Sequence, residues 1–291
     1  MRRRTRVRSV AATIMVLGLM FGSQVARAAV VDIDSTDLTG DNATWDLQAD
    51  FAYGSGGPCV AKHGFTPAED GSWGAQTDAF DGGLYIVVDG KTFDDNDGNG
   101  TKKGQTMKVG PTTMSRLNIR RTERALQTSP TLRSLVTFQN PTNDVITVPV
   151  IWDSAVGSDD SEDTRASSDG DTFTTKTDRW FVTSDDPTSP SDPPVTMALY
   201  GKGPVAEKVA SVVWAPEDDP TDPPGEGCIT LKYNLKIPAK STRYLMFFTE
   251  MNDTNENAIA GAAKFNSVKA GNDLLVGLSD AVMSKILNWN L

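Results

Sequence analysis

The 291-residue sequence has one histidine and two cysteines, and this scarcity narrows the chemistry open to it. A Ser-His-Asp device would have to use His63, but the sequence has no Gly-x-Ser-x-Gly element. Catalytic zinc sites use several histidine or cysteine ligands, so zinc catalysis is not expected. His63 lies in a glycine-containing loop without an obvious partner, and we interpret it as an ordinary surface residue. No catalytic residue is predicted.

Basic residues are also few outside the N-terminus. Residues 1–28 hold six of the 28 basic residues and none of the 38 acidic ones, which leaves 22 basic residues and a formal net charge of −16. A chain of this charge repels phosphate backbones, so nucleic-acid binding is not expected. No later apolar run is long enough to cross a bilayer. The mature part is therefore expected to have no integral membrane segment.

The N-terminus has the three parts of a secretory signal peptide. Five arginines between residues 2 and 8 precede an apolar run over residues 10–21, and the small-x-small sequence at 26–28 fits a cleavage site. The apolar run is shorter than the roughly 20 residues that span a bilayer. We expect cleavage after Ala28 and a secreted, cell-surface or periplasmic protein, with a retained membrane anchor as the alternative.

The two cysteines, Cys59 and Cys228, are expected to form a disulfide in an oxidising compartment. The bridge would close a long loop, which the chain-entropy model values at roughly 5 kcal/mol. Two separately buried thiols are the alternative.

Apolar and polar residues alternate with period two over residues 45–53 and 229–237, which predicts strands with one buried face. Shorter strands are predicted over Leu84–Val88, Met114–Arg121, Leu132–Gln139, Val145–Trp152, Arg179–Thr183, Val195–Tyr200, Val209–Trp214 and Arg243–Thr249. Turns rich in Pro, Asn and Asp at residues 140–144 and 238–241 join pairs of them. We predict an all-β fold, an antiparallel β-sandwich that is a single domain over residues 29–291, with a supersandwich as its larger form.

The last forty residues differ from the rest. Residues 256–268 and 280–289 are predicted to be helical, the second with Ser279 as its N-cap. Val282, Ile286 and Trp289 would share one face of that helix. We expect a short C-terminal helical segment that covers the sandwich.

A run of oxygen-bearing residues at alternate positions resembles the start of an EF-hand calcium loop. Asp95, Asp97 and Asn99 hold the first, third and fifth places, a glycine holds the sixth, and the Thr101 carbonyl would be the next ligand. The twelfth place, normally glutamate, is Thr106. A hairpin loop without metal is the simpler interpretation of this segment, and calcium as its cofactor is the alternative.

Acidic residues also crowd residues 157–171, where Arg165 is the one opposing charge. A solvated loop is the simpler interpretation, and cation binding is the alternative. Among the tryptophans, Trp73 lies between loop glycines and is the predicted exposed platform for a ligand, while the others accompany apolar strands and are expected in the core.

Several packing and turn segments between about residues 80 and 291 resemble an uncharacterised secreted bacterial β-sandwich module. They are Leu135–Thr142, Val148–Asp159, Thr177–Thr183, Ile237–Phe248, Leu274–Ser279 and Ile286–Trp289. The resemblance implies a two-sheet sandwich at the cell exterior and brings no catalytic residues.

These observations favour a secreted, non-enzymatic binding or structural module of the cell exterior, with calcium as a candidate stabilising ion and a glycan or another surface protein as its candidate partner. The alternative is a carbohydrate-active protein, a glycoside hydrolase, a lyase or a carbohydrate-binding protein, that uses loop carboxylates and Trp73. A self-assembling surface protein is a third hypothesis.

Overall fold

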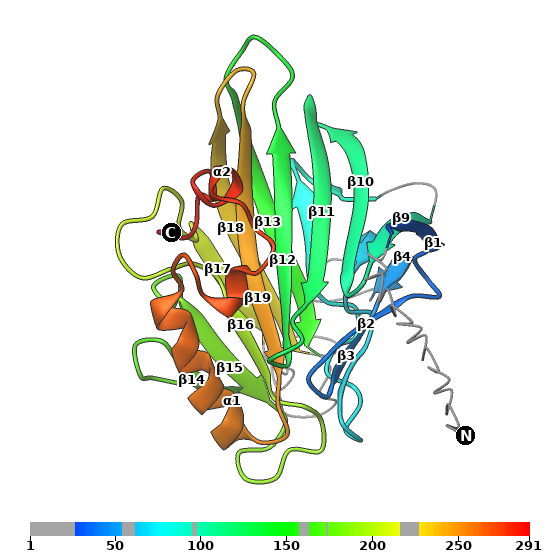
Figure 1. Ribbon diagram of the computed structural model, residues 1–291. Helices are drawn as coiled ribbons and strands as arrows, with labels where there is room; N and C mark the ends of the chain where they lie inside the picture. Colours follow the sequence, from blue (N-terminus) through cyan, green and yellow to red (C-terminus); the bar gives the residue numbers. More distant parts are fainter. Residues whose placement is uncertain (1–26, 54–61, 95–97, 157–162, 173, 216–226) are drawn as a thin grey trace, which may run out of the picture.

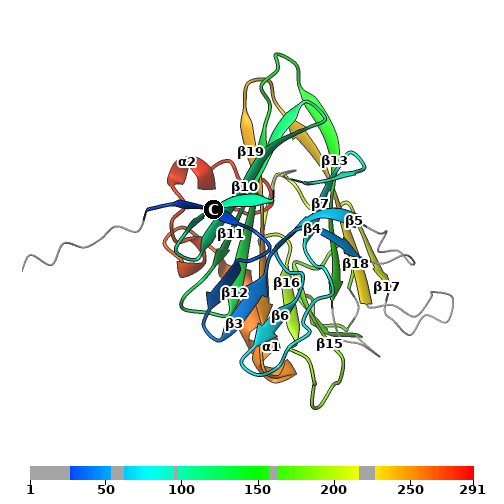
Figure 2. The same cartoon turned by 90° about the vertical axis from the view of Figure 1, so that its right-hand side faces the viewer.

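The computed structural model describes residues 27–53, 62–94, 98–156, 163–172, 174–215 and 227–291. Its strands form two large antiparallel sheets and two small ones (Figures 1 and 2). Strands account for 49% of the structure and helices for 9%, so the predicted all-β antiparallel sandwich is confirmed. Among the described residues, no helix is long and apolar enough to span a membrane.

The larger sheet has nine strands. In order across the sheet they are β1 (Ala29–Asp32), β9 (Asn99–Lys103), β10 (Thr106–Met114), β11 (Leu117–Ala125), β12 (Thr131–Gln139), β19 (Thr242–Met251), β16 (Val195–Ala198), β15 (Trp180–Ser184) and β14 (Asp163–Ser167).

The second sheet has five strands, and the two small sheets have three and two. In order, the strands of the five-stranded sheet are β17 (Ser211–Ala215), β18 (Gly227–Ile237), β13 (Ile146–Val156), β7 (Tyr85–Val88) and β8 (Lys91–Thr92). The small sheets contain β2 (Asp37–Gly40), β3 (Ala43–Asp46) and β6 (Gly71–Trp73), and β4 (Gln48–Tyr53) with β5 (Lys62–Thr66).

The main core lies between the two large sheets. In β18 the residues from Ile229 to Ile237 are buried at every second position, as the alternation predicted. Trp152 of β13 packs against Phe247 of β19, with ring centroids 4.0 Å apart. Because the two strands belong to different sheets, this contact joins the layers across the sandwich.

A second apolar cluster covers the outer face of the nine-stranded sheet. It joins residues of β12, β15 and β19 to α1 (Asn255–Ala262), the 3₁₀ turns η1 (Ala263–Ser267) and η2 (Asp273–Leu275), and the segment that begins at α2 (Asp280–Met283). In Figure 2, α2 lies on the side of this sheet that faces away from β13 and β18. The predicted helical cover is therefore present.

The last predicted helix is shorter than expected. α2 ends at Met283 because the chain then pairs with β19: Tyr244 N donates to Lys285 O at 3.1 Å, and Leu287 N donates to Tyr244 O at 2.9 Å. Ile286 and Trp289 still belong to the outer apolar cluster, and Val282 packs against it. The three residues therefore meet the same apolar cluster, as predicted. They do not share a helix face, because a strand-like bridge between Tyr244 and Ile286 replaces the second half of the predicted helix.

Two strand predictions were wrong in their bounds. The segment predicted as Met114–Arg121 is a hairpin, because Ser115 and Arg116 adopt left-handed φ values of 45° and 68° and reverse the chain between β10 and β11. Residues 45–53 divide at Leu47 into β3 and β4, which pair with β6 and β5 in separate sheets. The prediction missed β1, β2, β5, β6, β8, β9 and β14, and it included only Met114 of β10.

Candidate functional site

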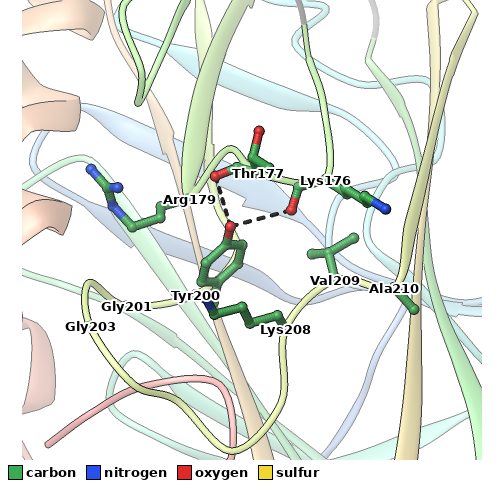
Figure 3. A pocket seen from close by; sticks show the side chains of 9 residues that line it. All are labelled: Lys176, Thr177, Arg179, Tyr200, Gly201, Gly203, Lys208, Val209 and Ala210. Atoms are coloured by element: carbon green, nitrogen blue, oxygen red, sulfur yellow. Dashed lines mark hydrogen bonds between the residues drawn. The ribbon is translucent and has the colours of Figure 1, made fainter.

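The described residues line an open pocket of about 420 Å³ beside β15, β16 and β17, called here the Tyr200 pocket (Figure 3). Its lining residues are Lys176, Thr177, Arg179, Tyr200, Gly201, Gly203, Lys208, Val209 and Ala210. They come from the turn that precedes β15 and from the loop that connects β16 to β17. A cavity of this size suits a small molecule or one or two units of a chain.

Backbone contacts fix where Tyr200 stands. Leu199 N donates to Arg179 O at 2.8 Å, which extends the β15–β16 pairing beyond the end of β16. The Leu199 carbonyl accepts from Tyr233 Oη at 3.2 Å and from Asn288 Nδ2 at 2.8 Å. Arg179, Leu199, Tyr233 and Asn288 come from four different segments of the chain. The position of Tyr200 therefore depends on tertiary structure.

The Tyr200 hydroxyl closes one end of the pocket. It donates to the Thr177 carbonyl at 2.8 Å, with the Lys176 carbonyl at 3.3 Å as a second acceptor (Figure 3). Burial raises the pKa of Tyr200 above its ordinary value, and nearby Arg179 opposes this shift while Asp178 adds to it. The phenol is therefore protonated at neutral pH and serves as a donor.

Asp178 shapes the turn at residues 175–179. Its buried carboxylate accepts from Thr175 N at 2.8 Å and from Thr175 Oγ1 at 2.9 Å. A side-chain acceptor that bonds a backbone N–H three residues earlier holds a turn closed. Asp178 thus presents Lys176, Thr177 and Arg179 toward the Tyr200 loop.

The C-terminal segment positions the loop that contains Tyr200 through backbone hydrogen bonds. Gly201 N donates to Asn288 O at 2.8 Å, and Glu207 N donates to Leu287 O at 2.9 Å. A Cβ at Gly201 would lie 3.1 Å from the Trp289 ring, so the close approach of loop and C-terminal segment favours glycine there. The loop is therefore tied at two points to the C-terminal segment.

Three cationic side chains line the pocket. Lys208 Nζ lies 5.9 Å from the Tyr200 ring centroid, within cation–π range. Arg179 donates to Asn266 Oδ1 at 2.7 Å, and its buried Nε has no acceptor among the described residues. Lys176 is exposed, and its side chain extends toward Ala210 in Figure 3. No lining residue is acidic.

The predicted calcium ligands are only partly within the described residues. Asp95 and Asp97 lie outside them. Asn99 and Thr101 lie in β9, which is paired with β1 on one side and β10 on the other. Both residues are exposed and lie on the same face of the strand. Calcium binding at this segment stays a prediction.

Another acidic group comes together in the tertiary structure. Asp169, Asp171 and Asp178 each place one carboxylate oxygen within 4.8 Å of the others. Ser167 Oγ donates to Asp169 at 2.7 Å and to Asp171 at 2.9 Å, and this bond holds the pKa of Asp169 below its ordinary value. The single proton of the Ser167 hydroxyl is shared between the two carboxylates, and whether this group binds a cation stays open to test.

The remaining predicted site residues do not meet at the Tyr200 pocket. Trp73 of β6 is half-buried and packs against the main core, so its use as a ligand platform stays a prediction. Cys228 is buried in β18, while Cys59 lies outside the described residues, so their pairing also stays a prediction. The backbone of His63 belongs to β5 rather than to a loop.

A carboxyl pair stands elsewhere, on the small three-stranded sheet. Asp46 of β3 is the cross-strand partner of Asp37 of β2. A hydrogen bond with Asp37, burial and the nearby charges of Asp37, Asp70 and Glu69 raise the pKa of Asp46 to about 7. Neither Asp37 nor Asp46 lines the Tyr200 pocket or the smaller cavity around Asn42. The pair therefore faces no described cavity.

Sequence reasoning did not find the Tyr200 pocket. Its lining residues come from two separate segments, residues 176–179 and 200–210, and include no recognised motif. One local sign was available: Gly201-Lys202-Gly203-Pro204 interrupts the predicted strands on either side and adds a basic residue to an acidic chain.

Comparison with known proteins adds little to this geometry. No family model and no curated protein sequence matches the chain. Among solved structures, a polysaccharide lyase aligns with 79% of this chain and 35% of its own, at 10% identity and a TM-score of 0.42. A protein described as a kojibiose phosphorylase from the human microbiome aligns with 82% of this chain and 34% of its own, at 9% identity and a TM-score of 0.41.

A protein described as an aldose 1-epimerase from Klebsiella pneumoniae aligns with 69% of this chain and 60% of its own, at 11% identity and a TM-score of 0.31. The chain spans about a third of the length of the first two proteins. A likeness at this level carries no information about the chemistry of the Tyr200 pocket.

Proposed function

We propose that this chain is an extracytoplasmic, non-enzymatic binding module whose ligand, a glycan, occupies the Tyr200 pocket. The composition of the pocket carries the proposal. Its lining offers an aromatic ring, apolar surface from Val209 and Ala210, and cationic donors, which are groups that bind and orient a ligand. The signal-peptide pattern of residues 1–28 supports the extracytoplasmic location.

The same lining disfavours glycoside hydrolysis. Hydrolysis of a glycosidic bond needs two carboxyl groups across a cleft, and none of the lining residues has one. The described carboxyl pair with one strongly raised pKa, Asp37 and Asp46, lies outside the pocket. We therefore rank the carbohydrate-active enzyme second, and a polysaccharide-degradation screen on the purified protein tests it.

A pocket-filling variant tests the binding role. Ala210→Trp would place an indole in the pocket without a change of charge, while Ala206→Trp adds the same group to an exposed position of the same loop outside the lining. A glycan array is expected to show signals with the unaltered protein and Ala206→Trp, and to lose them with Ala210→Trp. Equal signals from both variants would place the ligand elsewhere, and no signal from any protein would refute the glycan ligand.

A further inference from the structure

The charge of the Tyr200 pocket is opposite to that of the chain. Acidic residues outnumber basic ones by 38 to 28, yet three of the nine lining residues are cationic and none is acidic. Like charges gathered around one cavity repel one another, and an anion bound among them relieves the repulsion. From this juxtaposition we propose that the pocket selects saccharides that carry a carboxylate or sulfate group, an inference that rests on the glycan-binding function proposed above.

None of the three cations forms an ion pair with a carboxylate of the described residues. Among the described residues, no carboxylate lies within ion-pair distance of Lys176, Arg179 or Lys208. The acidic residues next to them in sequence are Asp178 and Glu207. The Asp178 carboxylate is buried and accepts from Thr175, and burial raises the pKa of half-buried Glu207 above its ordinary value. Neither side chain lines the pocket.

The donors differ in how firmly they are held. The Arg179 guanidinium is fixed by Asn266 Oδ1 and points away from the Tyr200 ring in Figure 3, so the two lysines are the adaptable donors of the pocket. Lys208 and Lys176 are both exposed, and Lys208 Nζ lies 5.9 Å from the Tyr200 ring centroid. Hydrogen bonds from such cations to carboxylate or sulfate oxygens are about twice as strong as bonds between neutral groups.

The shape of the pocket favours a sugar over a bare ion. A single carboxylate or sulfate would leave most of the 420 Å³ to water. The Tyr200 ring with Val209 and Ala210 provides apolar surface that suits the C–H face of a sugar ring (Figure 3). An acidic saccharide uses both the apolar wall and the cationic side chains.

Calorimetric titration with three probes tests the inference: an oligogalacturonate, a sulfated oligosaccharide and a neutral oligosaccharide of equal length. We expect either or both acidic probes to bind, with Kd rising as sodium chloride increases, because exposed charges are screened by salt. Lys208→Gln and Lys176→Gln are each expected to weaken binding about tenfold, the loss typical of one charge-assisted hydrogen bond. Lys236→Gln makes the same change on the exposed face of β18 and should leave Kd unaltered.

The outcomes separate this inference from the glycan-binding function. Equal Kd values for neutral and acidic probes, unaltered in both lysine variants, would overturn the charge selection. In that case Ala210→Trp would still test whether the saccharide occupies the pocket. Acidic binding that Lys236→Gln weakens as much as Lys208→Gln would show attraction by general charge and would also overturn it. If no saccharide binds to the folded protein, both the inference and the function on which it rests are wrong.

Discussion

Replacement of Glu123 should reveal how strongly the sandwich depends on one buried ion pair. Arg121 and Glu123 lie two residues apart on the inner face of β11, and both side chains are fully buried. Arg121 Nε donates to Glu123 Oε1 at 2.8 Å, and Ser134 Oγ donates to Glu123 Oε2. Glu123→Leu removes the partner carboxylate and leaves the Arg121 charge in the core.

The structure sets the size of the effect. Burial lowers the pKa of Arg121 and Glu123 opposes this shift, yet the guanidinium stays protonated. Arg121 also donates to the Leu84 carbonyl at 2.7 Å and lies 5.1 Å from the Phe65 ring centroid, which are contacts that cannot replace an opposite charge. Loss of one partner of a buried pair costs about 3–5 kcal/mol, so Glu123→Leu should lower the free energy of unfolding by that amount.

Replacement of both partners should lower the free energy of unfolding less than replacement of Glu123 alone. Buried pairs exchanged for apolar residues of similar volume are often neutral in stability, because the desolvation penalty of the two charges disappears together with their attraction. Arg121→Met combined with Glu123→Leu is therefore expected to unfold at a higher urea concentration than Glu123→Leu alone. The double variant still leaves the Leu84 carbonyl without the Arg121 donor, which limits its recovery.

Urea unfolding followed by tryptophan fluorescence measures these differences, since Trp45 and Trp152 are buried reporters. Asp144→Ala is the matched control: it removes an exposed partner of Arg116 at 3.7 Å and should leave the midpoint nearly unaltered. The reasoning fails if Glu123→Leu shifts the midpoint no more than Asp144→Ala. It also fails if the effects of the two core substitutions simply add in the double variant.

Three further outcomes are expected. The raised pKa of Asp46 means that the folded state binds a proton more tightly than the unfolded state between pH 3.8 and about 7, so this group's contribution to stability is present at pH 4 and lost as pH rises through about 7. Asp46→Asn should therefore raise Tm at pH 8 but not at pH 4, and a pH-independent change would contradict the assignment. Asn288→Ala removes side-chain bonds to Leu199 and Met246 and should lower the free energy of unfolding by about 2–3 kcal/mol, whereas Asn290→Ala, at an exposed position, should not. Calcium should raise Tm and release heat on titration, Asp97→Ala should abolish both effects and Asp171→Asn should preserve them; the reverse pattern would move the calcium site to the Asp169 group.

The alternation of apolar and polar residues along the chain was enough to predict an all-β fold. The pattern of residues 229–237 survives in β18 because a strand with one buried face must place apolar side chains at every second position. Turn chemistry at residues 140–144 also acts locally: Asn140 Nδ2 donates to Asp144 O at 2.7 Å. The same Asn140 Nδ2 also donates to the carbonyls of Ile237 and Pro238, so tertiary contacts complete a turn that the local sequence already predicts.

Pairing between segments far apart in sequence determined the features that local sequence patterns did not predict. Residues 45–53 read as one strand, but β3 and β4 pair in different sheets, and the predicted final helix yields to pairing with Tyr244. The Tyr200 pocket arises the same way: the turn at Asp178, the loop after β16 and the C-terminal segment form one site through hydrogen bonds between chain segments far apart in sequence. Local residue patterns determine which segments are strands, whereas long-range pairing and packing determine which side chains meet.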